Sequence, residues 1–190
     1  MHTPPQPQIG RAARFWAAGF TLLEALVVLA VLGVLVSLGV PTITSLHAKH
    51  QLQAQAEGLL DSLVLARSEA LRRQQPVTVC ARLDAQCDSG ANWQQGWWVF
   101  VDTNHNARRD DGEPLMEARA PLPPQVNFGA NSTVKGYFSY GPVGRSQSTG
   151  GAFMAGTWRF CSSASPEGWQ VVSNALGKPR IEKYTPLQCP

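Results

Sequence analysis

A single carboxylate in a long apolar run is the feature that most constrains this chain. Residues 20–40 carry one charged side chain, Glu24, among apolar and small residues. At a rise of about 1.5 Å per residue, a helix over this run is about 31 Å long, which matches the ~30 Å hydrocarbon core of a bilayer. The run therefore predicts a membrane-spanning helix over residues 20–41. A carboxylate inside it costs about 2.5–3.5 kcal/mol on insertion scales, so Glu24 needs a partner.

The charges around this run predict its orientation. Arg11 and Arg14 precede the run and no acidic residue does, so the positive-inside rule places the N-terminus in the cytoplasm. Everything after Pro41 is then expected in the periplasm, with the protein in the inner membrane. A chain of 190 residues has room for one span and one globular domain with its own core.

The apolar run differs from an ordinary secretory signal. Such a signal has a shorter apolar stretch followed by a small-x-small cleavage site, and none follows here. The obvious small residue is Gly19, which stands before the run. Cleavage after Gly19 removes residues 1–19 as a leader, keeps the span and creates a new amine on Phe20, one helical turn from Glu24.

Gly19, the following Phe-Thr-Leu-Leu-Glu, the Leu/Val-rich helix and Pro41 resemble the class III signal of type IV pilins and pseudopilins. The resemblance implies that a prepilin peptidase cuts after Gly19 and methylates the amine of Phe20. It also implies that Glu24 pairs with the terminal amine of a neighbouring subunit during assembly. Such a charge-assisted contact supplies the missing partner. The alternative is a plain signal anchor with a stray glutamate.

Beyond Pro41 the pattern predicts a second helical half and then a β-rich domain. Apolar residues recur at spacings near 3.6, which predicts an amphipathic helix over residues 42–75, with a kink at Pro41. From residue 76 to 190, short β-type runs alternate with turn residues. The fold class is therefore α+β, a long N-terminal helix packed on antiparallel sheet. The expected strands are 77–81, 96–101, 125–128, 134–140, 157–161, 169–173 and 180–184.

Several sequence blocks resemble, in their order, the GspH/FimT group of minor pilins and minor pseudopilins. The resemblance implies a type IV pilin-like fold and a structural role, without enzymatic activity, in a type IV pilus or type II secretion pseudopilus. Other pilins or pseudopilins are then the partners. The alternative is a tip pseudopilin like type II secretion system protein H, with no role with DNA. The blocks include LARSEALRR from Leu65, VTVC from Val77, GWWVFVD from Gly96 and GTWRFC from Gly156.

The segment of residues 102–113 carries the most site-like cluster. Counted from Asp102, oxygen-bearing side chains fall at positions 1, 3, 5, 9 and 12, the ligand spacing of a calcium loop. Ala107 stands at position 6, where the sharp turn of that loop takes glycine, and two arginines add positive charge. The alternative is a polar hairpin turn held by Asx hydrogen bonds. The five candidates are Asp102, Asn104, Asn106, Asp110 and Glu113; no other cofactor is expected.

The four cysteines are expected to form two structural disulfides in the oxidising periplasm. Cys80 and Cys87 enclose a short loop after a strand, whereas Cys161 ends a strand and Cys189 lies one residue from the C-terminus. Of the three possible connectivities, the sequential one, Cys80 with Cys87 and Cys161 with Cys189, ties down a loop and the tail. A zinc site would need more closely spaced ligand pairs.

The basic C-terminal segment resembles a DNA-binding motif. In the part of the group associated with DNA uptake in natural transformation, a C-terminal Gly-Arg-x-Arg motif carries DNA binding, and residues 177–180, Gly-Lys-Pro-Arg, are similar to it. The resemblance implies that Lys178 and Arg180 contact double-stranded DNA. Lys183 extends the basic tail. Arg145, in the glycine-rich loop 141–151, joins them if folding brings it near.

The overall charge gives DNA binding no support. The chain has 16 Lys and Arg; without Arg11 and Arg14 it keeps 14, against 13 Asp and Glu, a formal charge of +1. Binding therefore has to be local and depends on phosphate neutralisation at a few cations. The alternative is a solvated basic turn before the last strand.

Two further patterns bear on function. The histidines, His2, His47, His50 and His105, do not stand with a nucleophile in any catalytic pattern, which argues against an anchored enzyme. Trp97 and Trp98 are adjacent, so they must point to opposite faces of a strand. The sequence leaves open which of the two is exposed.

Overall fold

A computed structural model of the chain describes residues 20–83, 86–87, 92–185 and 189, and the side chains of residues 36–43 lie outside the described part. The chain divides into two compact units, Met1–Val40 and Pro41–Pro190. Within the described residues, no helix combines the length and the apolar character that a bilayer crossing requires. The leader predicted over 1–19, with Gly19, lies outside the described residues.

The helix α1, Leu22–Arg73, contains Pro41 without a break in its helical assignment. The Thr21 hydroxyl accepts a hydrogen bond from the backbone N–H of Glu24 at 3.2 Å and so caps the first turn. In the first unit, the large apolar side chains between Leu22 and Leu35 are 51–81% exposed. This segment is apolar on all sides, as the composition predicted.

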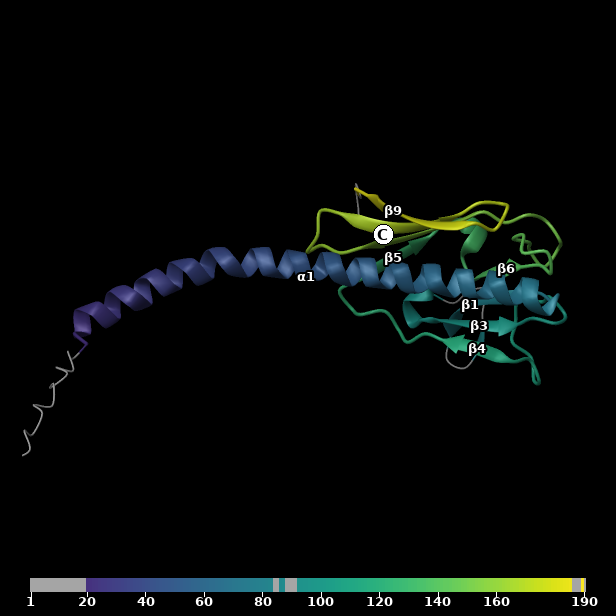
Figure 1. Cartoon of the computed structure of the whole chain (residues 1–190), viewed down its shortest axis with the longest axis horizontal. Helices are drawn as coiled ribbons and strands as arrows, with labels where there is room; N and C mark the ends of the chain where they lie inside the picture. Colours follow the sequence, from purple (N-terminus) through teal and green to yellow (C-terminus); the bar gives the residue numbers. More distant parts are fainter. Residues whose placement is uncertain (1–19, 84–85, 88–91, 186–188, 190) are drawn as a thin grey trace, which may run out of the picture. The chain divides into compact units, whose positions relative to one another are not determined.

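The second unit combines the rest of α1 with two antiparallel sheets (Figure 1). One sheet has the order β2-β1-β3-β4, and β6 pairs with the edge of β1 that faces away from β3. The second sheet has the order β5-β7-β8-β9. The strands are β1 (Val77–Leu83), β2 (Gln86–Cys87), β3 (Trp97–Val101), β4 (Leu115–Ala118), β5 (Asn127–Ala130), β6 (Tyr137–Tyr140), β7 (Gly156–Cys161), β8 (Gly168–Ser173) and β9 (Pro179–Tyr184). Two short 3-10 helices, η1 (Trp93–Gln95) and η2 (Ser132–Val134), join them.

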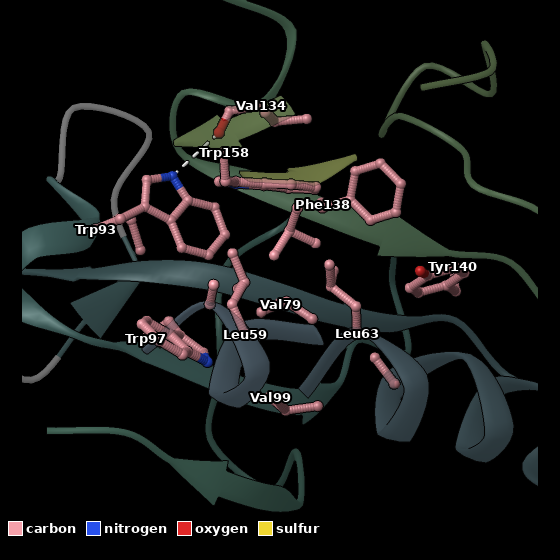
Figure 2. Packing of buried hydrophobic residues seen from close by; sticks show 14 of the residues in the cluster. Leu59, Leu63, Val79, Trp93, Trp97, Val99, Val134, Phe138, Tyr140 and Trp158 are labelled. Carbon is pink, nitrogen blue, oxygen red and sulfur yellow. Dashed lines mark hydrogen bonds between the residues drawn. The ribbon is translucent and has the colours of Figure 1, made fainter. Parts of the chain in front are cut away.

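One hydrophobic core joins the helix and both sheets. Leu52, Ala56, Leu59, Leu63, Ala66 and Ala70 form the fully buried face of α1 at helical spacing. In Figure 2, Leu59 and Leu63 lie against Val79 and Val99, while the Trp93 indole N–H donates to the carbonyl of Val134 at 3.0 Å. The small alanines let the sheets approach the helix closely. Between the layers, large aromatic side chains fill the remaining space.

Three large apolar residues of the second half of α1 lie outside this face. Leu46, Val64 and Leu71 are exposed, because they are turned about 100–120° around the helix axis from the buried stripe. At the end of α1, Glu69 accepts hydrogen bonds from Arg72 and Arg73. The bond from Arg72, followed by that from Arg73, lowers the pKa of Glu69 to about 2.

The structure confirms the fold class and both predicted disulfides. Cys80 is bonded to Cys87 and Cys161 to Cys189, with Cα–Cα distances of 5.6 and 5.8 Å. Trp97 is the buried member of the tryptophan pair, and its indole N–H donates to the Ser62 hydroxyl. The sequence patterns missed β2 and β4.

Candidate functional site

The basic segment begins in a turn that Asn174 organises. Its side-chain oxygen accepts hydrogen bonds from the backbone N–H groups of Leu176 and Lys178, both at 3.1 Å, and its carbonyl accepts from Gly177 N–H at 2.8 Å. The turn leads directly into β9, so the exposed Lys178 stands immediately before that strand. A single amide therefore sets the backbone from which the basic side chains project.

Gly177 brings this turn against the glycine-rich loop. Its φ is +71°, and a Cβ there would lie 2.7 Å from a Tyr140 ring carbon, 2.9 Å from the Gly144 carbonyl oxygen and 3.0 Å from Ser146 N. Only glycine accepts both this conformation and this contact. The Ser146 hydroxyl lies 3.0 Å from the Ala175 carbonyl and joins the two segments further.

The contact places Arg145 beside the turn. The sequence had left open whether folding brings this residue near the basic segment. Arg145 lies between Gly144 and Ser146, the two residues that Gly177 approaches, and its side chain is exposed. Its guanidinium carbon lies 5.4 Å from the centre of the Phe153 ring. From the helix, Arg67 Nε donates to the Gly144 carbonyl at 3.0 Å and holds the loop in place.

The other two basic candidates lie on opposite faces of β9. Arg180 pairs with Val172 across the sheet and points away from the core, with its Nε 3.3 Å from a Glu182 oxygen. Lys183 lies three residues after Arg180, and side chains alternate along a strand, so it points to the other face of β9. There its ammonium lies 5.3 Å from the centre of the Trp169 ring. The structure thus brings the turn that carries Lys178 against the loop that carries Arg145, leaves Arg180 on the outer face of β9 and places Lys183 on the opposite face.

The five oxygen-bearing candidates between Asp102 and Glu113 lie in one loop after β3. Fully buried Asp102 accepts hydrogen bonds from the Thr78 hydroxyl at 2.7 Å and from the N–H groups of Asn106 and Ala107, both at 2.9 Å. Glu113 accepts from Thr103 and Asp110 N–H groups. Ala107 has a φ of +59°, so the loop makes the sharp turn without glycine.

The remaining members of this loop also bond to one another. The side-chain amides of Asn104 and Asn106 donate to the same Asp110 oxygen, at 2.7 and 2.8 Å. Among the described residues, no three His, Cys, Asp or Glu side chains are arranged to hold a metal ion. These hydrogen bonds favour the polar-turn alternative, and calcium binding stays a prediction.

The N-terminal candidates lie at the start of α1. Phe20 precedes the helix, and Glu24 stands in its first turn, both exposed. A carboxylate there lies at the positive end of the helix dipole, and an amine created on Phe20 would adjoin the same turn.

Comparisons with known proteins agree with this architecture. The sequence model of the family "Type II transport protein GspH" matches residues 55–177. The chain belongs to the GspH family. The pilin-like protein PilA1 of Thermus thermophilus is 38% identical over 95 residues, which cover half of this GspH-family chain and 54% of that protein. The match thus spans about half the length of the relative.

Solved structures share the fold of this GspH-family chain. The type IV minor pilin FimU of Pseudomonas aeruginosa superposes with a TM-score of 0.53 at 17% identity, covering 74% of this chain and 96% of that one. A second crystal form of FimU gives 0.51 at 18% identity. The family assignment and the type IV pilin-like fold are therefore confirmed, and a structural subunit, not an enzyme, is the class to which the chain belongs.

Sequence reasoning missed the residues that support the basic turn. No sequence motif marks Asn174, Gly144, Ser146 or Tyr140. The only local signal is the asparagine at 174 followed by the glycine at 177, because these residue types are typical of turns. Tyr140 lies buried under Gly177, and burial raises the pKa of its phenol, so the ring acts as a neutral support.

Proposed function

We propose that this GspH-family chain is a subunit of a type IV pilus or a type II secretion pseudopilus and that residues 20–41 hold it in the inner membrane before assembly. The exposed apolar surface between Leu22 and Leu35 carries this proposal. In water such a surface is strongly unfavourable, so it requires cover by lipid or by neighbouring apolar helices. A filament of pilin-type subunits supplies that cover when the helix leaves the bilayer.

The direction of insertion follows from charge and redox chemistry. Arg11 and Arg14 favour a cytoplasmic N-terminus, and the disulfides of the second unit fit the periplasm, where such bonds persist. The β-rich unit is then displayed outside the filament core. A pilus and a secretion pseudopilus share these features; the basic turn favours the pilus, and the alternative is a tip pseudopilin without a role with DNA.

Processing by a prepilin peptidase is the step that prepares the chain for assembly. We expect mature protein from host membranes to lack residues 1–19 and to carry one methyl group on the amine of Phe20, as seen by intact-mass and N-terminal peptide analysis. A Gly19→Leu variant should keep its leader, because the bulky side chain blocks cleavage. Wild-type protein that retains residues 1–19 in a host with active peptidase would contradict this proposal.

A second function, contact with double-stranded DNA, is favoured by the packing of Gly177 on the glycine-rich loop. This packing brings the turn that carries the exposed Lys178 against the loop that carries the exposed Arg145, and Arg180 adds a cation on the outer face of β9. Phosphate neutralisation by a few such cations gives weak, salt-sensitive binding. The residues between Glu117 and Glu167 include no Asp or Glu, which favours a positive local potential around Arg145.

A salt titration tests the DNA contact. With the full chain in detergent and a short labelled duplex, we expect Lys178→Gln and Arg145→Gln each to reduce the slope of log affinity against log salt by about 1. Lys183→Gln, which removes the same charge on the other face of β9, should leave the slope unchanged. If wild-type protein binds no duplex even at low salt, the DNA role is excluded.

A further inference from the structure

A small polar cavity lies between the loop after β3 and the glycine-rich loop. Its volume is about 210 Å³, enough for a small polar group with its waters. We propose that this cavity binds one phosphate group of a nucleic-acid backbone, with Arg108 as its principal ligand. The inference rests on the proposed DNA contact and extends it to a second, separate set of residues. The cavity is lined by Asn106, Ala107, Arg108, Gly136, Tyr137 and Thr149.

The lining supplies hydrogen-bond donors for an anion. No carboxylate is among the described lining residues, and in the described part of the chain Arg108 forms no ion pair. Its planar guanidinium can donate two parallel hydrogen bonds to phosphate oxygens. The Tyr137 phenol oxygen accepts from the Thr149 N–H at 3.2 Å and lies 3.4 Å from the Thr149 hydroxyl, so these two hydroxyl groups stand together at the cavity.

The glycine-rich loop connects this cavity to the basic turn. On one side, Gln147 Nε2 lies 3.3 Å from His105 Nδ1 of the loop after β3, and Thr149 reaches the cavity itself. On the other side, Ser146 contacts Ala175 of the basic turn. A DNA strand that crosses the glycine-rich loop would therefore pass Arg108 at one end of the loop and Arg145 with Lys178 at the other.

Arg108 is the only lysine or arginine among the described residues that line this cavity. Adjacent Arg109 is directed elsewhere, with its guanidinium carbon 5.9 Å from the Trp98 ring centre. The closest carboxylates in sequence are Asp110 and Asp111. Asp110 lines a second cavity, which Arg108 and Arg109 also line, but it is absent from the lining of this one, and one of its oxygens already accepts two side-chain amide hydrogen bonds.

The test compares two adjacent arginines. Duplex binding by the full chain in detergent is titrated across salt for Arg108→Gln and for Arg109→Gln, which removes the same charge from the same loop. We expect Arg108→Gln to reduce the salt slope by about 1 and Arg109→Gln to reduce it much less. In a second arm, inorganic phosphate is compared with chloride at equal ionic strength for its effect on the melting temperature.

The outcomes separate this inference from the DNA proposal. If Lys178→Gln lowers the slope but Arg108→Gln does not, or if the two adjacent arginine variants behave alike, the cavity is not a phosphate site and the DNA contact stands. If no duplex binds, both proposals fail. A phosphate-specific rise in melting temperature that Arg108→Gln abolishes, without duplex binding, would assign the cavity to free phosphate and overturn the nucleic-acid source.

Discussion

Glu24→Ala is expected to keep the protein in the membrane and to remove it from filaments. Without the carboxylate, insertion becomes easier by about 2.5–3.5 kcal/mol on insertion scales. Assembly loses the partner of the amine on Phe20 in the neighbouring subunit, and a buried unpaired amine is strongly disfavoured. Immunoblots of sheared filaments and of membranes should show the variant almost entirely in the membrane fraction.

Glu57→Ala is the matched control for this experiment. Glu57 lies in the same helix but in the second unit, where it is exposed and accepts a surface hydrogen bond from Gln53 at 2.8 Å. Its loss should leave incorporation unchanged. Filaments that contain Glu24→Ala at the wild-type level would remove the proposed ion pair from the mechanism of assembly.

Asp102→Ala should lower the stability of the second unit markedly. The substitution leaves the Ala107 N–H without its acceptor. It also removes one of two acceptors from the Thr78 hydroxyl, which keeps Ser139, and from the Asn106 N–H, which keeps the Asn104 side chain. Because a donor left unpaired costs about 1–3 kcal/mol and two further hydrogen bonds are lost, we expect the free energy of unfolding to fall by about 2–3 kcal/mol. Urea unfolding of the full chain in detergent, followed by tryptophan fluorescence, measures this change.

Asp111→Ala controls for charge in the same loop, and calcium can be tested in parallel. Asp111 is exposed, so its replacement should change the free energy of unfolding by about 0.5 kcal/mol or less. The polar-turn alternative predicts equal wild-type stability in calcium and in chelator. A calcium-dependent stabilisation that Asp102→Ala abolishes would instead establish the calcium loop. Equal losses in the two variants would contradict the buried acceptor role of Asp102.

The helix and most strands were predictable because their signals are local. The buried stripe from Leu52 to Ala70 repeats at the helical period, β3 is a continuous run of aromatic and β-branched residues, and β7 alternates between buried and more exposed positions. Strand β4, Leu115–Ala118, was missed because its side chains are exposed or half-buried without alternation, and it depends on pairing with β3. Adjacent Trp97 and Trp98 had to face opposite ways, but only the position of α1 makes Trp97 the buried one.

The candidate basic site was predictable only in part. Arg180 and Lys183 are three residues apart, so an extended strand sends them to opposite faces, which the sequence already implied once a strand was expected there. The proximity of Arg145 to Lys178 has no local signal. It arises because Gly177 packs on Gly144 and Ser146, over thirty residues away in the chain.

By itself, the sequence determined the class of this protein. The lone carboxylate of the apolar run, the glycine before it and the order of the motif blocks are read along the chain, because periodicity and charge act over neighbouring residues. Only the tertiary structure decided which cations share a surface, that Asp102 serves as a buried acceptor, and that a donor-lined cavity opens beside Arg108. These features depend on contacts between distant segments, which the pairing of the two sheets and their packing on α1 create.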